Sequence, residues 1–389
     1  MRTPMKFLAV PLTPIHIGDG TELLPDHYRL ANGEGGREVQ LFEPNAVLAA
    51  MPPEALQQLA RPNLRDIYAE LHRRVRPAHV LARIPISGSA YLELQKALSG
   101  TQRFGAVQPF IRSGLKPFIP GSSIKGALRT AFLSALAAGN QAVHQKLHQK
   151  TMRHKHAVLV REAFRTTRND TAEDPFRFVH VADVPIPEGR TRIDQVQIIS
   201  RKPGVKTKGI QMHYERLLSL VDVEKGKYKE VALEGAVIEV DEEGLRACCA
   251  ARADAAPHED ISWDRLRRAV NSFHWAIWQR ERQHFAQYFQ QNAHLNRIEQ
   301  NWLERIKIAQ PHTHGVLLRL GRFGHFESKS VEGLRQGYVP QRKRDDRYRR
   351  PDEWGDTRTV LPLPTKQGAD AVVPFGWLLL VPDNQGTQS

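Results

Sequence analysis

Residues 110–136 constrain the fold of this chain more than any other stretch. An extended run ends at Pro120-Gly121, and Ser122 and Ser123 follow directly. Proline and glycine end strands and serine is favoured at a helix N-terminus, so we expect a helix that Ser122 or Ser123 caps. Apolar residues then recur at every fourth position and form one face of this helix, at Ile124, Leu128, Phe132 and Leu136.

The start of this expected helix is suited to a phosphate group. Helix N-termini present amide donors and a partial positive charge. Lys125 and Arg129 are one helical turn apart and add two full charges on one face. The stretch is not a Walker A motif, because Lys125 precedes the second glycine, Gly126, instead of following it. We therefore expect a polyanion to bind here, without ATPase chemistry.

The charge of the whole chain points in the same direction. The sequence has 56 Lys and Arg against 42 Asp and Glu, a formal net charge of +14. Such a basic excess is typical of proteins that bind polyanions, and the alternative is a solvated basic surface without a partner. The sequence has no apolar run of about 20 residues that would span a bilayer and no signal peptide, so we expect no membrane partner.

Cysteine usage indicates the compartment. The chain has 2 cysteines, Cys248 and Cys249, which are neighbours in the sequence. Adjacent cysteines do not form an ordinary structural disulfide, and a pair of thiols alone does not make a zinc site. We therefore expect a soluble protein of the reducing cytoplasm.

Strand-like and helix-like segments are interspersed along the chain, which predicts an α+β fold. Strands are expected at 5–17, 37–42, 78–86, 176–186, 231–240, 315–320 and 372–381. Helices are expected at 44–50, 54–59, 64–75 and 263–306. The aromatic stripe in the last of these is read as core packing rather than as a stacking surface. Residues 141–170 are basic and show little apolar periodicity.

A basic stretch broken by glycine and proline lies between two further strand-like runs, QVQII and IQMHY. This pattern predicts a protruding β-hairpin near 190–213 with a basic tip. The tip carries Arg201, Lys202, Lys206 and Lys208.

His16 and a glycine stretch near the C-terminus are further candidates for function. His16 lies between a strand and a glycine turn, and as a general base it needs a partner such as Asp19 or Asp26. We favour a hydrogen-bonded histidine that holds the glycine turn. The glycine stretch lets a backbone approach a phosphate closely, although a simple turn is the alternative. It comprises Gly321, Arg322 and Gly324, with Arg319 and Lys329 beside it.

Histidine-rich segments do not make a convincing metal site. They contain His144, His148, His154 and His156, and later His312 and His314. No HExxH pattern accompanies them, and positively charged neighbours disfavour a cation. We expect neither a metal nor a cofactor.

Two motifs in combination resemble the RAMP superfamily of CRISPR-associated proteins. The first is PLTPIHIGDG at residues 11–20, and the second is PFIPGSSIKGALR at residues 117–129. In that family the first motif ends the first strand, and the second opens a helix at the RNA-binding face. The stretch GRFGHFESK at residues 321–329 looks like the family's C-terminal Gly-rich loop.

Within the superfamily, the chain most resembles the capping subunit of the type III-A Csm complex. The matches are scattered over most of the chain, at YRL (28–30), LFEP (41–44), YER (214–216), TR (357–358) and PFGW (374–377). Neither the helical region 263–306 nor residues 141–170 has a counterpart in these motifs.

The resemblance implies an RRM-like, ferredoxin-type RAMP core with a β-hairpin thumb. It implies an N-terminal RAMP domain at 1–240, with the thumb near 190–213. A helical region and a C-terminal RAMP-like part with the Gly-rich loop then occupy 241–389. The RNA-binding residues that it implies, with those read from the charges, are His16, Gly18, Ser122, Ser123, Lys125, Arg129, Arg201, Lys202, Lys206, Lys208, Arg319, Gly321, Arg322, Gly324 and Lys329.

The function that the resemblance implies is non-catalytic. Such a subunit binds the 3′ portion of a CRISPR RNA, caps the filament of backbone subunits and acts in crRNA maturation and antiviral defence. Its partners are CRISPR RNA, target RNA and other Csm subunits, both backbone RAMP proteins and small helical ones. One alternative is a RAMP-type endoribonuclease that uses His16 or an early-loop aspartate. Another is a structural adaptor whose basic surface meets acidic subunits.

Overall fold

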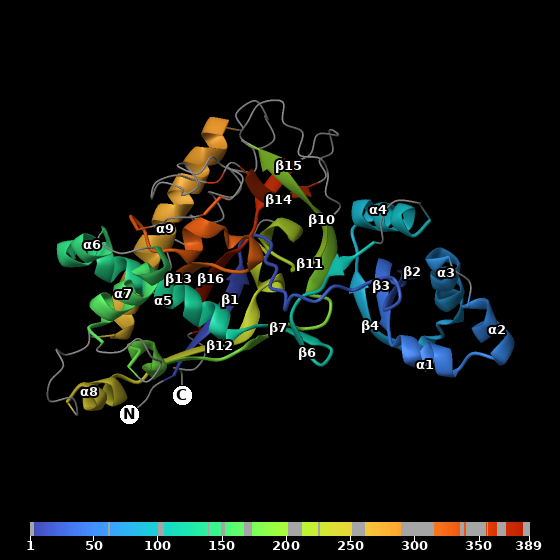
Figure 1. Cartoon of the computed structure of the whole chain (residues 1–389), viewed down its shortest axis with the longest axis horizontal. Coiled ribbons are helices and arrows are strands. Elements are labelled where there is room, and N and C mark those ends of the chain that lie inside the picture. Colours follow the sequence, from blue (N-terminus) through green and yellow to red (C-terminus); the bar gives the residue numbers. More distant parts are fainter. Residues whose placement is uncertain are drawn as a thin grey trace.

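The computed structural model describes residues 4–60, 63–99, 105–138, 140–148, 152–166, 173–200, 212–224, 226–250, 261–288, 315–334, 338–339, 355, 357–363 and 371–383. The chain forms a larger body and a smaller lobe, which lies at the right of Figure 1. The body contains two five-stranded sheets and a three-stranded sheet, and the small lobe contains a second three-stranded sheet.

Helices and strands alternate along the chain, so the fold is α+β, as predicted. The helices are α1 (Pro44–Ala49), α2 (Pro53–Gln58), α3 (Leu64–Arg74), α4 (Gly88–Ser99), α5 (Gly121–Ala138), α6 (Gln141–His148), α7 (Met152–Phe164), α8 (Glu242–Ala250) and α9 (Trp263–Tyr288). The strands of the first half are β1 (Met5–Pro11), β2 (Tyr28–Gly33), β3 (Gly36–Phe42), β4 (Val80–Pro85), β5 (Val107–Gln108), β6 (Arg112–Ser113), β7 (Lys116–Ile119), β8 (Val179–Val181) and β9 (Val184–Pro185). The later strands are β10 (Thr191–Ser200), β11 (Met212–Leu217), β12 (Leu233–Val240), β13 (Val316–Arg319), β14 (Thr357–Leu363), β15 (Ala371–Pro374) and β16 (Trp377–Pro382).

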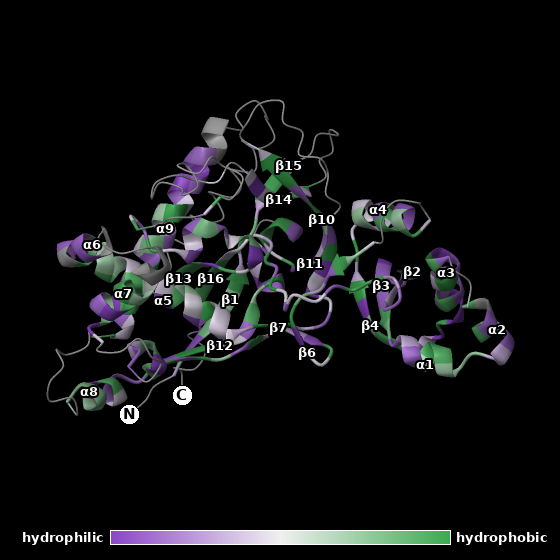
Figure 2. Ribbon diagram, in the orientation of Figure 1, coloured by the Kyte–Doolittle hydropathy of each residue, from purple (hydrophilic) through white to green (hydrophobic). Residues whose placement is uncertain are grey.

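The first large sheet has the order β13-β16-β1-β12-β8, and every pairing in it is antiparallel. Helices α5 and α9 pack against this sheet and against each other, and the largest hydrophobic core lies between these elements. Figure 2 shows hydrophobic residues along β1, β12, β16 and α5, whereas α3 is mostly hydrophilic. Burial of this apolar surface is the main term that stabilises the body.

The second large sheet has the order β15-β14-β10-β11-β5 and contains the predicted hairpin. Strands β10 and β11 pair antiparallel from Thr191↔Leu217 to Val196↔Met212. The far end of β10 pairs with β14 instead, from Gln197↔Val360 to Ser200↔Thr357. The hairpin is therefore present at its base, and its basic tip at 201–211 lies outside the described residues.

The small lobe consists of the antiparallel sheet β2-β3-β4 with α1, α2 and α3. It has its own apolar cluster around Phe42, Val47 and Leu71. A parallel bridge between Ile86 and Ile193 connects the lobe to β10, and the Ser87 amide donates to the Ile193 carbonyl there at 3.0 Å.

Four expectations from the sequence need correction. The strand expected at 5–17 ends at Pro11, and the strands expected at 176–186 and 372–381 are each divided into two short strands that belong to different sheets. Residues 141–170 contain two helices, α6 and α7. Helix α7 packs on α5, and this tertiary contact stabilises helices that weak apolar periodicity did not predict.

The division into 1–240 and 241–389 stays a prediction. Each large sheet contains strands from both sides of residue 240, because β13 and β16 join β1, and β14 and β15 join β10. Of the helix expected at 263–306, residues 289–306 lie outside the described ranges. Among the helices that are described, none combines the length and the apolarity of a membrane span.

Residues 12–17, which follow β1, connect the sheets to the surrounding loops. The Leu12 amide donates to the Trp377 carbonyl (2.9 Å), and the Gly376 amide donates to the Pro14 carbonyl (2.8 Å). Three more amides donate to carbonyls of this segment, namely Leu217 to Ile15 (2.8 Å), Arg322 to His16 (2.9 Å) and Ile111 to Ile17 (2.7 Å). One short extended segment thus fixes the positions of β11, β16 and the loops at 109–111 and 321–324.

Gly321 lies against the backbone of His16 and should not tolerate a side chain. Its φ of 82° and ψ of −176° lie in a region that is essentially restricted to glycine. A Cβ atom here would lie 2.4 Å from the His16 carbonyl oxygen. We predict that Gly321→Ala lowers the free energy of unfolding by about 1–3 kcal/mol, measured by urea denaturation.

Gly35→Ala is the matched control for that experiment. A Cβ at Gly35, in the turn between β2 and β3, meets no atom within 4 Å. Its free energy of unfolding should stay within about 0.5 kcal/mol of wild type. An equal loss of stability in both variants would contradict the role assigned to Gly321.

Three buried histidines should make the fold sensitive to acid. Burial lowers the pKa of His16 and of His213 to about 4, and that of His274 to about 3. Between pH 6.5 and 4 the unfolded chain therefore binds protons that the folded chain does not. We predict that the free energy of unfolding decreases as the pH is lowered through this window, by about 1.4 kcal/mol per pH unit for each histidine.

Urea denaturation at several pH values tests this. His274→Phe removes one titrating group. The free energy of unfolding of this variant should decline less steeply, by about 1.4 kcal/mol per pH unit, the contribution of one proton. His27→Gln, at a side chain that is 50% exposed, is the matched control variant. Identical slopes for His274→Phe and wild type would contradict the assignment.

Candidate nucleic-acid interface

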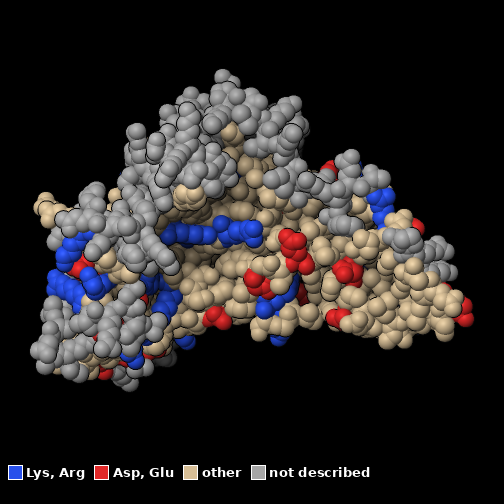
Figure 3. All heavy atoms as spheres, in the orientation of Figure 1, with Lys and Arg blue, Asp and Glu red and all other residues tan. Residues whose placement is uncertain are grey.

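A hollow of about 500 Å³ lies where three motif segments meet. Its walls come from the segment after β1, the first turns of α5 and the loop after β13. The lining residues are Ile17, Gly18, Ser122, Ser123, Gly126, Ala127, Thr130, Arg319, Leu320, Gly321, Arg322, Ser328 and Lys329. In Figure 3, Lys and Arg side chains form a row in the hollowed centre of the face shown. The structure therefore brings together segments that are about 300 residues apart in the sequence.

Helix α5 presents its N-terminal turns to this hollow, although its cap differs from the expectation. The helix begins at Gly121, so Ser122 and Ser123 lie inside its first turn and do not cap it. The Gly121 amide instead donates to Oδ1 of Asp183 at 2.7 Å. Because that carboxylate already sits at the helix N-terminus, it offsets part of the positive potential that a phosphate would otherwise meet.

Small and hydroxyl-bearing residues of α5 face the hollow at a spacing of four. They are Ser122, Gly126 and Thr130, with Ser123 beside them. A Cβ atom on Gly126 would meet nothing within 4 Å, so this glycine leaves open space in the wall. The two serines were predicted as site residues from the sequence, whereas Gly126 and Thr130 were not, although their i, i+4, i+8 spacing from Ser122 is the signal of one helix face.

Lys125 and Arg129 lie on a neighbouring face of α5 and do not line the hollow. Arg129 forms an ion pair with Asp174 (2.7 Å), and its guanidinium lies 5.3 Å from the centre of the Phe164 ring. Partial burial lowers the pKa of Lys125 despite the nearby Asp174 carboxylate. Arg129 therefore contributes to the packing of α5 against α7, and contact of Lys125 and Arg129 with RNA stays a prediction.

The Gly-rich loop provides the exposed cations of the hollow. Arg322 and Lys329 are both exposed, and Nζ of Lys329 donates to the Arg322 carbonyl at 3.3 Å. Desolvation lowers the pKa of Lys329, and the positive charges of Arg319 and Arg322 add to this effect. Gly324 is buried, and a Cβ there would lie 2.8 Å from Oγ of Ser328. The loop thus places two exposed positive charges on a closely packed base.

Arg319 differs from these two cations, because its side chain is 0% exposed. Its guanidinium pairs with Glu281 of α9 at 2.7 Å. Although Arg319 contributes atoms to the wall, its charge is directed into the protein.

His16 is a structural residue at the centre of the site. Its side chain is buried, with the residue only 1% exposed, and Nδ1 lies 2.7 Å from the Glu215 carbonyl oxygen. With Nδ1–H donating there, Nε2 is the basic nitrogen, and a Cβ on Gly18 would lie 3.0 Å from it. Tyr214 packs edge-on against the imidazole at 4.8 Å. This geometry is that of a hydrogen-bonded histidine that holds the glycine turn.

Asp19 and Asp26 are engaged locally. Oδ1 of Asp19 accepts the amide and the hydroxyl of Thr21 (2.9 and 2.6 Å), which lowers the pKa of Asp19. Asp26 lies 2.9 Å from Nδ1 of its neighbour His27. Neither pairs with His16 by a hydrogen bond in the described structure.

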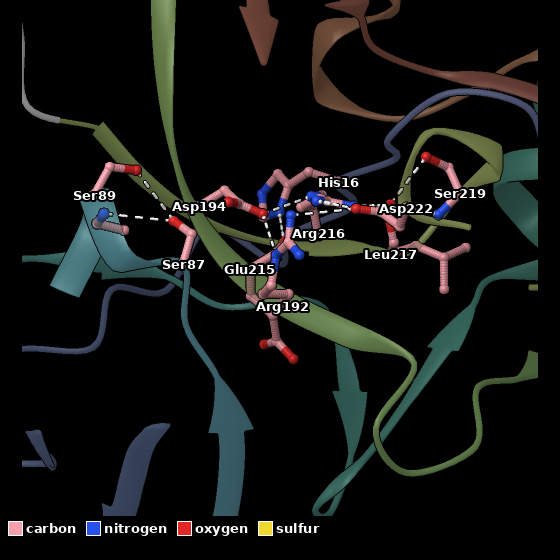
Figure 4. A network of polar contacts seen from close by, with 11 residues as sticks. His16, Ser87, Ser89, Arg192, Asp194, Glu215, Arg216, Leu217, Ser219 and Asp222 are labelled. Carbon is pink, nitrogen blue, oxygen red and sulfur yellow. Dashed lines mark hydrogen bonds and ion pairs between the residues drawn. The ribbon is translucent and has the colours of Figure 1, made fainter. Parts of the chain in front are cut away.

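A buried ion network fixes β10 and β11 beneath this site (Figure 4). The side chain of Arg216 is 0% exposed and donates through Nε to Asp194 (2.8 Å) and through Nη2 to Asp222 (2.7 Å). Arg192 joins Asp194 at 2.9 Å. Because removing one partner would leave an uncompensated buried charge, substitution of a single member of this network should destabilise the base of the hairpin.

The remaining candidates are outside what the structure describes. Arg201, Lys202, Lys206 and Lys208 belong to the range 201–211. The histidines weighed as metal ligands, between His144 and His156 and at His312 and His314, also fall outside the described side chains. Within the part of the chain that is described, no group of three or more His, Cys, Asp or Glu is placed to hold a metal ion.

Solved structures share this fold over most of the chain. The crystal structure of T. onnurineus Csm5 is 19% identical, with a TM-score of 0.55, over 81% of this chain and 89% of that one. A chain in the cryo-EM structure of a Csm–crRNA–target RNA ternary complex of a type III-A CRISPR-Cas system is 19% identical, with a TM-score of 0.61, over 97% of this chain and 100% of that one.

Sequence comparison gives the family. An uncharacterised protein of Aquifex aeolicus (strain VF5) is 26% identical over 159 residues, which are 41% of this chain and 61% of that protein, so the chain spans about three fifths of this relative's length. The family model of the RAMP superfamily matches residues 9–244, a range that includes both N-terminal motifs. Since the match covers more than half of the 389 residues, the chain belongs to the RAMP superfamily.

Proposed function

We propose that this chain is a non-catalytic, RNA-binding subunit of a type III-A Csm complex that holds the 3′ portion of a CRISPR RNA and caps the backbone filament. The observation that carries the proposal is the hollow in which the segment after β1, the start of α5 and the Gly-rich loop converge. The likeness to a chain of a Csm–crRNA–target RNA complex supports it. CRISPR RNA, target RNA and other Csm subunits are the partners that it requires.

The chemistry of the hollow suits an RNA backbone. Exposed cations at Arg322 and Lys329 neutralise phosphates, and hydroxyls at Ser122 and Ser123 donate to phosphate or ribose oxygens. The Thr130 hydroxyl donates to the Gly126 carbonyl at 2.9 Å, so it offers RNA an acceptor oxygen. Glycines let the nucleic-acid backbone approach closely. Such contacts hold a guide in register without reading its sequence, as a protein that must accept many different guides requires.

The environment of His16 supports the non-catalytic part of the proposal. A general base needs access to the proton that it removes. His16 is only 1% exposed, and burial lowers its pKa to about 4. Asp19 and Asp26 form contacts with Thr21 and His27 instead of with His16.

Crosslinking within an assembled complex tests the proposal. The chain is expressed with the other Csm subunits, the complex is purified, and its bound RNA is crosslinked to protein. We expect crosslinks from the 3′ segment of the CRISPR RNA to the residues that line the hollow. Crosslinks only to the 5′ segment, or cleavage of repeat RNA by the isolated chain, would overturn the proposal.

The exposed cations of the loop should set the salt dependence of RNA binding. Each phosphate contact releases counterions and adds about 0.7 to the slope of log K against log[salt] for a single strand. We predict that Arg322→Ala with Lys329→Ala lowers the slope by about one to two and weakens binding uniformly across RNA sequences. Filter binding at several salt concentrations measures both quantities.

Two single variants provide the comparison. Arg246 on α8 has a side chain that is 73% exposed, so Arg246→Ala should leave the slope unchanged. Arg129→Ala should lower the thermal midpoint, because the ion pair with Asp174 is lost. It should change the salt slope less than the double variant does. A wild-type slope in the double variant would remove these two residues from the interface.

Gly126 allows the hollow to be filled without disturbing the fold. Since a Cβ at this position meets nothing within 4 Å, Gly126→Ala should raise the free energy of unfolding by up to about 1 kcal/mol through helix propensity alone. Gly126→Glu places a negatively charged side chain in the hollow and should weaken RNA binding by at least about tenfold. Thermal denaturation and filter binding measure the two effects, and a folded Gly126→Glu variant with wild-type affinity would contradict the location of the site.

A further inference from the structure

Four charged side chains from four different elements meet in the interior behind the Gly-rich loop. They are Glu281 of α9, Arg319 of β13, Glu327 in the loop and Arg358 of β14, and at most 2% of each side chain is exposed. Arg319 Nη2 lies 2.7 Å from Oε1 of Glu281, and Arg358 Nη2 lies 2.9 Å from Oε1 of Glu327. Oε1 of Glu281 also lies 3.9 Å from Nε of Arg358. With two positive and two negative charges, the cluster has no net charge.

This cluster is attached to both ends of the Gly-rich loop. Arg319 precedes Gly321 by two residues, and Glu327 precedes the exposed Lys329 by two residues. The loop ends are therefore held from behind by Glu281 and Arg358, which belong to elements outside the loop. Glu281 belongs to none of the sequence motifs described above, and α9 lies outside the range 9–244 that the family model matches.

Glu281 clamps the Arg319 side chain from a second direction. Its other oxygen, Oε2, accepts a hydrogen bond from Nε1 of Trp377 at 3.0 Å. The Arg319 guanidinium lies over the Trp377 ring, 5.2 Å from its centre, and Nε of Arg319 donates to the Phe375 carbonyl at 3.3 Å. Trp278 of α9 packs edge-on against Trp377 at 5.3 Å. Helix α9 thus fixes Arg319, and through it the start of the loop, by charge, hydrogen bonding and packing.

We propose that Glu281 is a positioning residue for the RNA-binding loop: it holds Arg319 inward, so that Arg322 and Lys329 face the hollow. The inference rests on the proposed function, because it assigns to α9 the control of an RNA-binding surface. It also separates the arginines of the loop into one that supports and one that contacts RNA.

The sign of one charge change distinguishes positioning from simple electrostatics. Glu281→Gln removes a negative charge close to the hollow. Long-range attraction alone would make the variant bind RNA more tightly. A loop that has lost its support would bind RNA more weakly, although the protein is more positive.

The experiment measures RNA binding by the full chain in its assembled complex at several salt concentrations. We expect Glu281→Gln to weaken binding by about tenfold and to lower the salt slope by about one to two. The matched control is Glu224→Gln, which removes the same charge from a side chain that is 79% exposed and should bind as wild type does. Equal or tighter binding by a folded Glu281→Gln variant overturns the proposal.

A second variant guards against a folding failure. Glu281→Gln with Arg319→Gln removes one negative and one positive charge, so the net charge of the cluster stays zero. Neither substitution then leaves a buried charge without its partner. The thermal midpoint of this double variant should be closer to the wild-type value than that of Glu281→Gln is. Its affinity for RNA should be as low as that of Glu281→Gln. Restored affinity in the double variant would show that charge balance, and not the position of Arg319, is what matters.

Hydrogen exchange in the wild-type chain needs no variant. The Arg322 and Gly324 amides are hydrogen-bonded to the carbonyls of His16 and Gly321. If Glu281 holds the loop, these amides should open only together with α9 around residue 281. Opening of the loop while α9 stays protected overturns the proposal. A wild-type complex that binds no RNA would refute the proposed function instead and leave the exchange result to be judged separately.

Discussion

The backbone of residues 12–17 is the constraint on which the rest of the structure depends. Peptide groups of this one segment pair with β11, with β16, with the loop at residue 111 and with the Gly-rich loop. Since these contacts are made by the backbone, they depend on the path of the chain rather than on particular side chains. The glycine at 321 is needed because any Cβ there would collide with this path. This extended segment therefore fixes the Gly-rich loop against the strand end that forms another wall of the hollow.

Local signals predicted the elements whose determinants lie close together in the sequence. The turn at Pro120-Gly121, the apolar face of α5 and the strands of the hairpin all depend on residues close in sequence. Local signals do not show which segments meet at the hollow. That prediction came from the resemblance to the RAMP superfamily. Side-chain direction was harder to foresee, because Arg129 turns toward Asp174, which is 45 residues away.

Two further features had no local signal. Asp183 caps α5 from 62 residues away in the sequence, so the serines in the motif are free to face the hollow. Glu281 pairs with Arg319 from another helix, and a periodic pattern gives no hint that a polar residue on a mostly buried helix has such a partner. The net charge of +14 was an equally indirect guide, since Arg216, Arg319 and Arg358 are buried in ion pairs. Within the described part of the chain, the exposed cations that line the hollow are Arg322 and Lys329.

The strand order of the first sheet has a consequence for synthesis. Strand β1 lies between β12 and β16, and β16 consists of residues Trp377–Pro382. While the ribosome makes the chain, β1 has an open edge until that last strand emerges, and such edges invite pairing with other chains. Contacts that distant in sequence also form slowly. The edge of β1 therefore stays exposed in the nascent protein for longer than its α+β content alone would suggest, and exposed strand edges favour aggregation.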